Sequence, residues 1–261
     1  MYLAIPSRDS CARAWVTAAS MISDAGEAYN VIIDVDKPSE HDALDHAVIS
    51  LVDRFLRERN QNPISTVANT IFPQRLYEAY GSPRFYLEYL KVFDRLSHKS
   101  WGRYFERLIR HKRLDGKEYS PLEVLIERLQ GRKGAQQYKS AYELALYDPL
   151  RDGRTFRGGQ CLSFLSFKMH PERGLTLSAM YRNHAYVTRC LGNLIGLGRL
   201  QAFIAKEAGL SVGPLTCIST HAELDKGSGW NLGDARRLVG EAAALLEVGN
   251  GLMASRPHRR T

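Results

Sequence analysis

Residues 161–169 read Cys-Leu-Ser-Phe-Leu-Ser-Phe-Lys-Met, an alternation of apolar and polar side chains that is typical of a β-strand. The tight turn Pro-Glu-Arg-Gly follows at residues 171–174. Residues 175–182 form a second strand pattern, which ends in Tyr-Arg-Asn at 181–183. Two such runs joined by a short glycine-containing turn are typical of an antiparallel pair. The sequence therefore predicts a β-hairpin over residues 161–182.

Helical and strand patterns mix on both sides of this hairpin. Further strands are expected at residues 30–36, 142–149 and 213–224, and helices at residues 9–27, 39–59, 121–129, 186–208 and 232–248. No linker or repeat interrupts the pattern. We therefore expect an α/β (α+β) fold, a mixed sheet covered by helices. It would form a single domain over residues 1–252, with a flexible basic tail at residues 253–261.

The bulk composition indicates an ordinary globular protein. Apolar residues make up 44% of the 261 residues and charged residues 25%, which excludes an intrinsically disordered chain. No apolar run approaches the roughly 18 residues of a membrane helix, and no secretory signal is visible. The four cysteines (11, 161, 190 and 217) show no metal-binding spacing. We expect a cytoplasmic protein with reduced cysteines, no metal and no membrane contact.

The charge pattern favours anionic partners. The formal net charge is +8, and basic residues recur every four positions at Lys91, Arg95, Lys99, Arg103 and Arg107. On one helix such a series drifts by only about 40° per step, which predicts a basic ridge. A solvated helix face is the favoured interpretation. A phosphate-binding ridge for the substrate and a surface for nucleic acid stay open, but no DNA-binding motif appears, so nucleic acid is not the expected partner.

Cys161 is the first candidate for chemistry. A cysteine on a strand is usually a small apolar core residue. Here Gly158, Gly159 and Gln160 precede it, and Arg154, Arg157 and Arg182 could supply positive charge that lowers the thiol pKa. A thiolate that attacks C6 of a pyrimidine makes C5 nucleophilic. Cys161 is therefore a candidate nucleophile for pyrimidine chemistry.

Three residues on the following elements could complete a nucleotide site. Arg182 ends a strand, where a guanidinium is usually solvated but can also bind a phosphate with two hydrogen bonds. Asn193 lies in an apolar helical stretch, where its carboxamide needs a partner; it could accept from N3–H and donate to O4 of a uracil ring. His221 lies on a predicted strand, where most histidines are core residues. Their order along the chain is what connects these residues.

That order and spacing resembles the thymidylate synthase and pyrimidine hydroxymethylase family. Gly-Gln-Cys161 with the following strand, Tyr-Arg182-Asn and the eleven-residue step to Asn193 resemble three blocks of that family. Trp101-Gly-Arg-Tyr104, residues 146–149 and residues 204–213 follow the same order. The similarity covers roughly residues 100–224 and is strongest in the second half.

The resemblance implies a role for each of these residues. Cys161 would be the C6 nucleophile and Tyr104 would line the site beside the thiol. Arg182 would bind the phosphate, Asn193 the base and His221 the sugar; Ser163 and Glu223 are further expected substrate contacts, Glu223 at the position of the family's sugar-binding tyrosine. The resemblance also implies a thymidylate-synthase-like sheet, 5,10-methylenetetrahydrofolate as cofactor and a homodimer packed through the sheet. Apolar residues lie on both faces of the first strand, Leu162 and Phe164 on one and Leu165 and Phe167 on the other. They are compatible with that dimer and equally with a strand buried inside one chain.

The chain also departs from the family pattern. Ser140-Ala141 stand where a partner subunit's arginines would come from, Ala185 replaces the folate-contacting aspartate, Leu162 replaces a histidine and Ile218-Ser219 replace Gly-Asp. Glu78 and Glu88 are the candidates for a catalytic glutamate, and residues 253–261 show no folate-closing segment. These departures affect the phosphate, sugar and folate contacts.

The sequence thus predicts a one-carbon transferase that adds a hydroxymethyl or methyl group at C5 of a pyrimidine nucleotide or nucleoside. Hydroxymethyl transfer is preferred because water can complete it without a hydride donor. The alternative is a non-catalytic nucleotide-binding or regulatory protein on the same fold. A nucleic-acid-binding protein is the third hypothesis.

Overall fold

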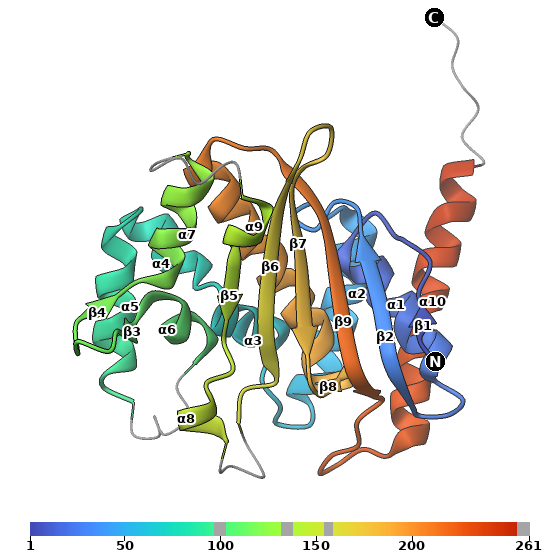
Figure 1. Cartoon of the computed structure of the whole chain (residues 1–261). Helices are drawn as coiled ribbons and strands as arrows, with labels where there is room; N and C mark the ends of the chain where they lie inside the picture. Colours follow the sequence, from blue (N-terminus) through green and yellow to red (C-terminus); the bar gives the residue numbers. More distant parts are fainter. Residues whose placement is uncertain (97–102, 132–137, 154–158, 255–261) are drawn as a thin grey trace, which may run out of the picture.

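A mixed β-sheet lies at the centre of the computed structural model, with helices packed behind it (Figure 1). The structure describes residues 1–96, 103–131, 138–153 and 159–254. Within them the strands of the main sheet are ordered β1-β2-β9-β7-β6-β5, and β8 pairs with β9. Their bounds are β1 Leu3–Ala4, β2 Glu27–Val35, β5 Glu143–Ala145, β6 Leu162–His170, β7 Gly174–Tyr181, β8 His184–Ala185 and β9 Val212–Glu223. The mixed α/β fold and the single compact domain are as expected.

The predicted hairpin is confirmed. β6 and β7 pair antiparallel, with Leu165 opposite Ala179 and Phe167 opposite Leu177. The register shifts between Leu162 and Phe164, so Leu162 lies opposite Tyr181. This bulge places Leu162 on the same buried face as Leu165 and Phe167. The expectation that Leu162 and Phe164 share one face is therefore wrong, because strict alternation does not survive an inserted residue.

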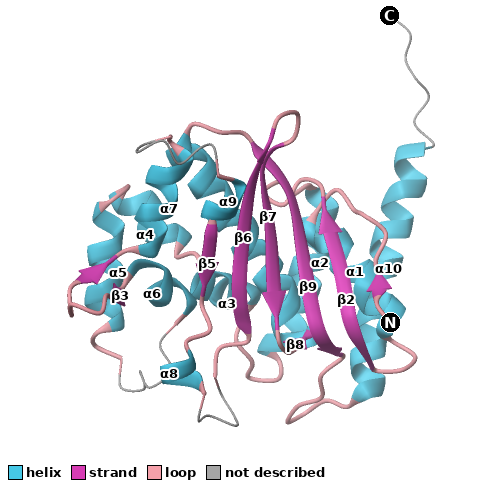
Figure 2. Cartoon of the chain, in the orientation of Figure 1, coloured by secondary structure: helices cyan, strands magenta, loops and turns pink. Residues whose placement is uncertain are grey.

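Some helices cover one face of the sheet, and others lie beside its β5 edge (Figure 2). Their bounds are α1 Cys11–Ile22, α2 Ala43–Arg57, α3 Ile64–Ile71, α4 Gln74–Tyr80, α5 Arg84–Phe93, α6 Tyr104–Ile109, α7 Pro121–Leu129, α8 Pro149–Asp152, α9 Leu191–Ala208 and α10 Leu232–Ala254. A π-helical turn, Tyr186–Cys190, leads directly into α9. α9 is buried almost all round and ends at Gly209, whose φ of 71° forms a left-handed cap.

The opposite face of the sheet has no helix on it in the described part of the chain (Figure 1). Ile32 of β2 lies opposite Ile218 of β9, and Ile218 lies opposite Met180 of β7. Phe164 of β6 lies opposite Met180. These four apolar side chains form a row across the strands, and Met180 is 39% exposed. We call this row, Ile32, Phe164, Met180 and Ile218, the open sheet face.

Several expected boundaries differ from the structure. α1 ends at Ile22, and β2 already begins at Glu27. α2 begins at Ala43, because Asp42 and Asp45 form a reciprocal capping box at its N-terminus. The strand expected at residues 142–149 is only Glu143–Ala145. Its proline instead occupies the first turn of α8, a position that suits a residue without an N–H.

The predicted basic ridge is wrong within the described residues. α5 ends at Phe93 and α6 begins at Tyr104, so the series does not lie on one helix. Arg107 is buried at 3% exposure and makes a bidentate ion pair with Asp152. Lys99 lies outside the described residues. Periodicity alone could not reveal this, because the spacing in the sequence is the same whether or not the residues lie on one helix.

The C-terminal helix extends beyond its expected end at residue 248. α10 runs to Ala254, so the boundary expected at residue 252 falls inside it. Residues 255–261 of the expected tail lie outside the described residues. None of the helices described here combines the length and apolar character needed to cross a membrane. In the same residues no group of three or more His, Cys, Asp or Glu side chains could hold a metal ion.

Candidate active site around Cys161

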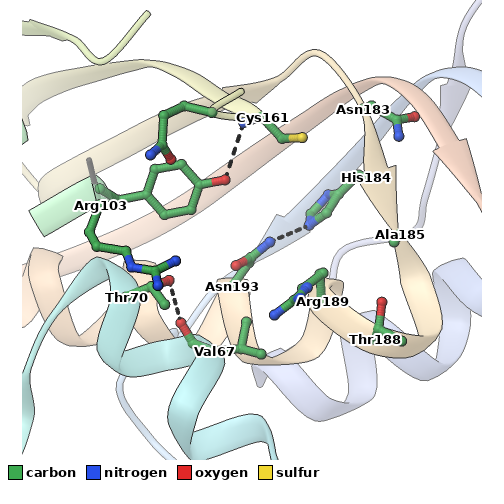
Figure 3. A pocket seen from close by; sticks show the side chains of 12 residues that line it. Val67, Thr70, Arg103, Cys161, Asn183, His184, Ala185, Thr188, Arg189 and Asn193 are labelled. Carbon is green, nitrogen blue, oxygen red and sulfur yellow. Dashed lines mark hydrogen bonds between the residues drawn. The ribbon is translucent and has the colours of Figure 1, made fainter. Parts of the chain in front are cut away.

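A cavity of about 370 Å³ opens beside Cys161, a size that suits a small organic ligand. α3, the start of α6, the approach to β6, β8 and the start of α9 all contribute to its wall (Figure 3). The lining residues are Val67, Thr70, Arg103, Tyr104, Gln160, Cys161, Asn183, His184, Ala185, Thr188, Arg189 and Asn193. We call it the Cys161 cavity. It brings together three of the residues expected from the sequence: Cys161, Tyr104 and Asn193.

Tyr104 fixes the backbone at the nucleophile. Its hydroxyl oxygen accepts hydrogen bonds from the backbone N–H groups of Cys161 and Leu162, both at 3.3 Å. These two bonds occupy both acceptor positions of the oxygen. Burial and the neighbouring Cys161 raise the pKa of Tyr104 to about 12. Tyr104 therefore keeps its proton at neutral pH and is suited to donate a hydrogen bond rather than to act as a base.

Arg182 lies against the thiol. Its backbone N–H donates to the carbonyl oxygen of Cys161 at 2.9 Å. Its guanidinium packs on Gly159, where a Cβ atom would lie only 2.7 Å from the arginine nitrogen Nη2. A larger residue at position 159 would require the guanidinium to move. Arg154 and Arg157, two further expected cations, lie outside the described residues.

The thiol of Cys161 is protonated at neutral pH. Burial raises its pKa above the ordinary value of 9.0, and the charge and hydrogen bond of Arg182, with the charge of Arg189, oppose that shift only in part. The net direction is opposite to the one that the sequence led us to expect. The sequence showed the nearby arginines but not how deeply the sulfur is enclosed, and the cost of desolvating a thiolate dominates.

Asn193 is held by a buried histidine that the sequence analysis missed. Its Nδ2 lies 3.0 Å from Nε2 of His184, and Nδ1 of His184 lies 2.9 Å from Oγ of Ser219. The ring of His184 stacks on Tyr181 with a centroid separation of 4.1 Å. Burial lowers the pKa of His184 to about 3. A neutral ring with its proton on Nδ1 accepts from Asn193 and donates to Ser219. This leaves the oxygen of Asn193 on the side away from His184 (Figure 3).

Close packing of α9 on α3 sets the position of Asn193. A Cβ atom at Gly192 would lie 2.7 Å from Cβ of Val67, so the glycine allows the two helices to touch. Val67 and Thr70 of α3 thereby form one wall of the cavity and Asn193 of α9 another. Arg189, four residues before Asn193, also lines the cavity with an exposed guanidinium, as does Arg103.

The other expected substrate contacts lie outside the lining. His221 lies next to it: Nδ1 of its ring contacts Oδ1 of the lining residue Asn183, and Nε2 lies 3.1 Å from Glu27. Ser163 donates to the carbonyl oxygen of Cys161 at 3.3 Å. Glu223 lies opposite Ala185 in the β8–β9 pair. These three residues lie on strands near the site, but none of them lines the cavity.

No carboxylate is among the residues that line the cavity, as far as the described chain shows. Glu78, one expected glutamate, accepts a hydrogen bond from Gln74 at 2.8 Å on α4. Glu88, the other, pairs with Lys91 on α5 at 2.9 Å. Neither therefore takes the place expected for a catalytic glutamate.

Sequence spacing could have pointed to Arg189, and in part to His184. Arg189 precedes Asn193 by four residues, a spacing that places two side chains on one side of a helix. His184 follows Arg182 by two residues. Its contact with Ser219, 35 residues further on, depends on the pairing of β8 with β9 and could not be derived from local sequence.

The cavity can therefore present a thiol, a phenol proton, an amide and two cationic side chains to one ligand. Such a set suits a flat heterocycle with an amide-like edge and an attached anionic group. The comparison with known protein families finds no matching model, and the comparison with curated proteins finds no match.

Proposed function

We propose that the chain is a thymidylate-synthase-like one-carbon transferase that acts at C5 of a pyrimidine nucleotide or nucleoside. The observation that carries the proposal is the joint lining of one cavity by Cys161, Tyr104 and Asn193, with Arg182 against the thiol. These side chains come from separate elements, and their chemistry is that of nucleophile, proton donor and base reader.

The proposed reaction begins at the thiol. The S–H proton passes to solvent water, sulfur forms a bond to C6, and the electrons of the C5–C6 double bond move toward O4. The carboxamide of Asn193 keeps one N–H for O4 and its oxygen for N3–H, because His184 takes only one of its two amide protons. The hydroxyl of Tyr104 can donate to the negative charge that develops on the ring.

C5 then forms a bond to a one-carbon unit at the oxidation level of formaldehyde. C5 loses its proton, the bond between sulfur and C6 breaks, and water supplies the hydroxyl group where the donor does not. The sum is replacement of C5–H by C5–CH2OH, with no net oxidation or reduction of the pyrimidine. A methyl product would require a hydride donor as well. Hydroxymethyl transfer is therefore the preferred reaction.

The described residues do not fit 5,10-methylenetetrahydrofolate well. If this cofactor were bound, it would supply the one-carbon unit. Ala185 lines the cavity at the position where the family resemblance implies a folate-contacting aspartate, and it has no polar group to offer. The steps above therefore assign the donor by chemical class only, and the cofactor is left to the experiment.

Tritium release from C5 tests the proposal. Uridine and cytidine nucleosides and nucleotides, tritiated at C5, are incubated with and without methylenetetrahydrofolate. We expect release that requires Cys161 and vanishes in Cys161→Ala, and product carrying a C5 hydroxymethyl group. Cys190→Ala, which removes a buried thiol outside the cavity, is the control. Absence of release from every pyrimidine, with and without the donor, would contradict the proposal.

A non-catalytic nucleotide-binding protein is the second candidate. The protonated resting thiol and the lack of a lining carboxylate in the described residues favour it. Nucleotide binding that is unaffected by Cys161→Ala, together with no C5 chemistry, would establish it in place of the enzyme.

We further propose a homodimer that packs through the open sheet face. The row of apolar side chains on that face supports it, because monomers rarely leave such a row on a sheet uncovered. We also propose a cytoplasmic location, which is compatible with the four free cysteines.

A further inference from the structure

A second cavity, of about 380 Å³, lies between α4, the C-terminal half of α9 and the segment before α2. None of its lining residues lines the Cys161 cavity: Pro38, Ser39, His41, Phe72, Gln74, Tyr77, Glu78, Arg199, Ala202, Phe203 and Lys206. A close contact builds one edge, because a Cβ atom at Gly198 would lie 2.2 Å from the carbonyl oxygen of Pro38. We call it the Arg199 cavity.

Arg199 is a half-buried cation without a matching anion. Its guanidinium makes no hydrogen bond or ion pair with the described residues. Burial lowers its pKa, and the charge of Glu78 opposes that shift from beyond ion-pair distance. A guanidinium stays charged in proteins, so partial desolvation without a partner costs free energy. An anion in this cavity would offset that cost.

A second cation lines the same cavity. His41 also lines it, but burial lowers the pKa of its ring, which is therefore neutral. Lys206 adds an exposed ammonium, which lies 5.4 Å from the ring centroid of Tyr77. The one carboxylate in the described lining, Glu78, is exposed and already accepts from Gln74. The cationic groups therefore exceed the anionic ones.

An aromatic wall completes the cavity. Phe72 and Phe203 lie 5.1 Å apart between ring centroids, as do Tyr77 and Phe203. Phe72 and Tyr77 lie 5.6 Å apart. Phe72 and Phe203 are 0% and 2% exposed, so Tyr77 is the ring of this wall that a ligand can touch, and the two phenylalanines support it from behind. A ring beside a cationic group suits a ligand with a flat apolar part and an anionic end.

We propose that the Arg199 cavity is a second binding site, for a small aromatic anion whose charged group pairs with Arg199 and Lys206. Its ring would pack on the aromatic wall. This site is separate from the proposed transferase site, so the two proposals can fail independently. Phosphate and carboxylate are the two anionic groups that a guanidinium binds through paired hydrogen bonds.

Calorimetric titration with phenyl phosphate, benzoate and inorganic phosphate tests the site. We expect the two aromatic anions to bind more tightly than inorganic phosphate, because only they use the aromatic wall. Their relative affinity shows which anionic group the site prefers. Arg199→Gln should weaken phenyl phosphate by about tenfold or more, as expected for loss of a charge-assisted hydrogen bond. Lys206→Gln, an exposed substitution that the fold tolerates, should weaken it several-fold.

Two matched arginine variants locate the binding. Arg75→Gln changes an exposed residue of α4 that does not line the cavity, and it should leave the affinity unchanged. Arg189→Gln removes a cation of the Cys161 cavity and should also leave it unchanged. The proposal is overturned if phenyl phosphate does not bind at low ionic strength. It is also overturned if Arg199→Gln and Lys206→Gln both bind phenyl phosphate as tightly as the wild type, or if binding is lost only in Arg189→Gln.

Discussion

Nδ2 of Asn193 lies 3.0 Å from Nε2 of His184, and this contact fixes which atoms of the carboxamide face the cavity. His184 is 1% exposed, and its other nitrogen contacts Oγ of Ser219 at 2.9 Å. The atom of Asn193 that contacts Nε2 is the amide nitrogen, which can only donate, so Nε2 accepts and Nδ1–H donates to Ser219. The oxygen of Asn193 is thereby oriented to accept from an N–H group of a ligand.

Replacing His184 should therefore weaken binding of the base without changing the reactivity of the thiol. In His184→Leu the amide of Asn193 loses its partner and is free to rotate. We expect the KM for the pyrimidine to rise about tenfold, consistent with one misplaced hydrogen-bonding group. Alkylation of Cys161 should be unchanged, because the thiol does not touch His184 in the described contacts. An unchanged KM in a folded variant would contradict the positioning role.

The same histidine predicts how stability depends on pH. Its pKa is about 3 in the folded protein, against 6.5 as the ordinary value. Between these values the unfolded chain binds a proton that the folded chain does not, so the free energy of unfolding falls as pH decreases through this window. The slope from this one residue approaches about 1.4 kcal/mol per pH unit.

Denaturant titrations from pH 7 to pH 4 measure this slope. His184→Gln should reduce it, and His46→Gln, which changes an exposed histidine, should not. Proton NMR gives a direct check, since the His184 ring should not titrate in the folded protein over that range. A ring signal that titrates near its ordinary value would refute the prediction.

The thiol of Cys161 should react slowly at neutral pH and faster in alkali. Burial holds its pKa above the ordinary value despite Arg182. The thiolate is the reactive form, so the rate of iodoacetamide alkylation should still be climbing at pH 9. Arg182→Gln removes the principal group that lowers the thiol pKa and should slow alkylation several-fold at a fixed pH. Arg173→Gln, on the distant β6–β7 turn, is the control. Equal rates in both variants would show that Arg182 does not act on the thiol.

A charge on the open sheet face should prevent dimer formation. Ile218 lies at the centre of that face, between Ile32 and Met180. Ile218→Lys would place an ammonium in the proposed interface, where an unpaired buried charge costs several kcal/mol, on the order of 3–5. Light scattering should show a dimer for the wild type and for Glu241→Lys on α10, and a monomer for Ile218→Lys. A monomeric wild type would contradict the proposed dimer.

Local sequence patterns predicted the elements better than their contacts. The hairpin followed from alternation and from the turn before Gly174, and the helix expected at residues 186–208 ends where α9 does. The bulge beside Leu162 did not, because it depends on how β7 pairs with β6. Arg107 had the spacing of a surface residue, yet Asp152, 45 residues further along the chain, holds it in the interior.

The candidate site shows the same division. Cys161 and Asn193 were candidates by residue type, and the family resemblance joined them and added Tyr104; the structure places all three around one cavity. The protonated state of the thiol and the contact of His184 with Asn193 could not be predicted. Both depend on burial and on side chains that meet only in the folded chain.

Hydrogen–deuterium exchange at C5, without any one-carbon donor, tests attack by Cys161 most directly. A thiolate that adds to C6 lets C5 take up a deuteron from D2O, and reversal of the addition then releases the original proton. Proton NMR of uridine and cytidine nucleosides and nucleotides follows the loss of the C5–H signal. The proposed mechanism predicts exchange with the wild-type protein and none with Cys161→Ala. Exchange that persists in Cys161→Ala, or no exchange on any of these pyrimidines, would contradict it.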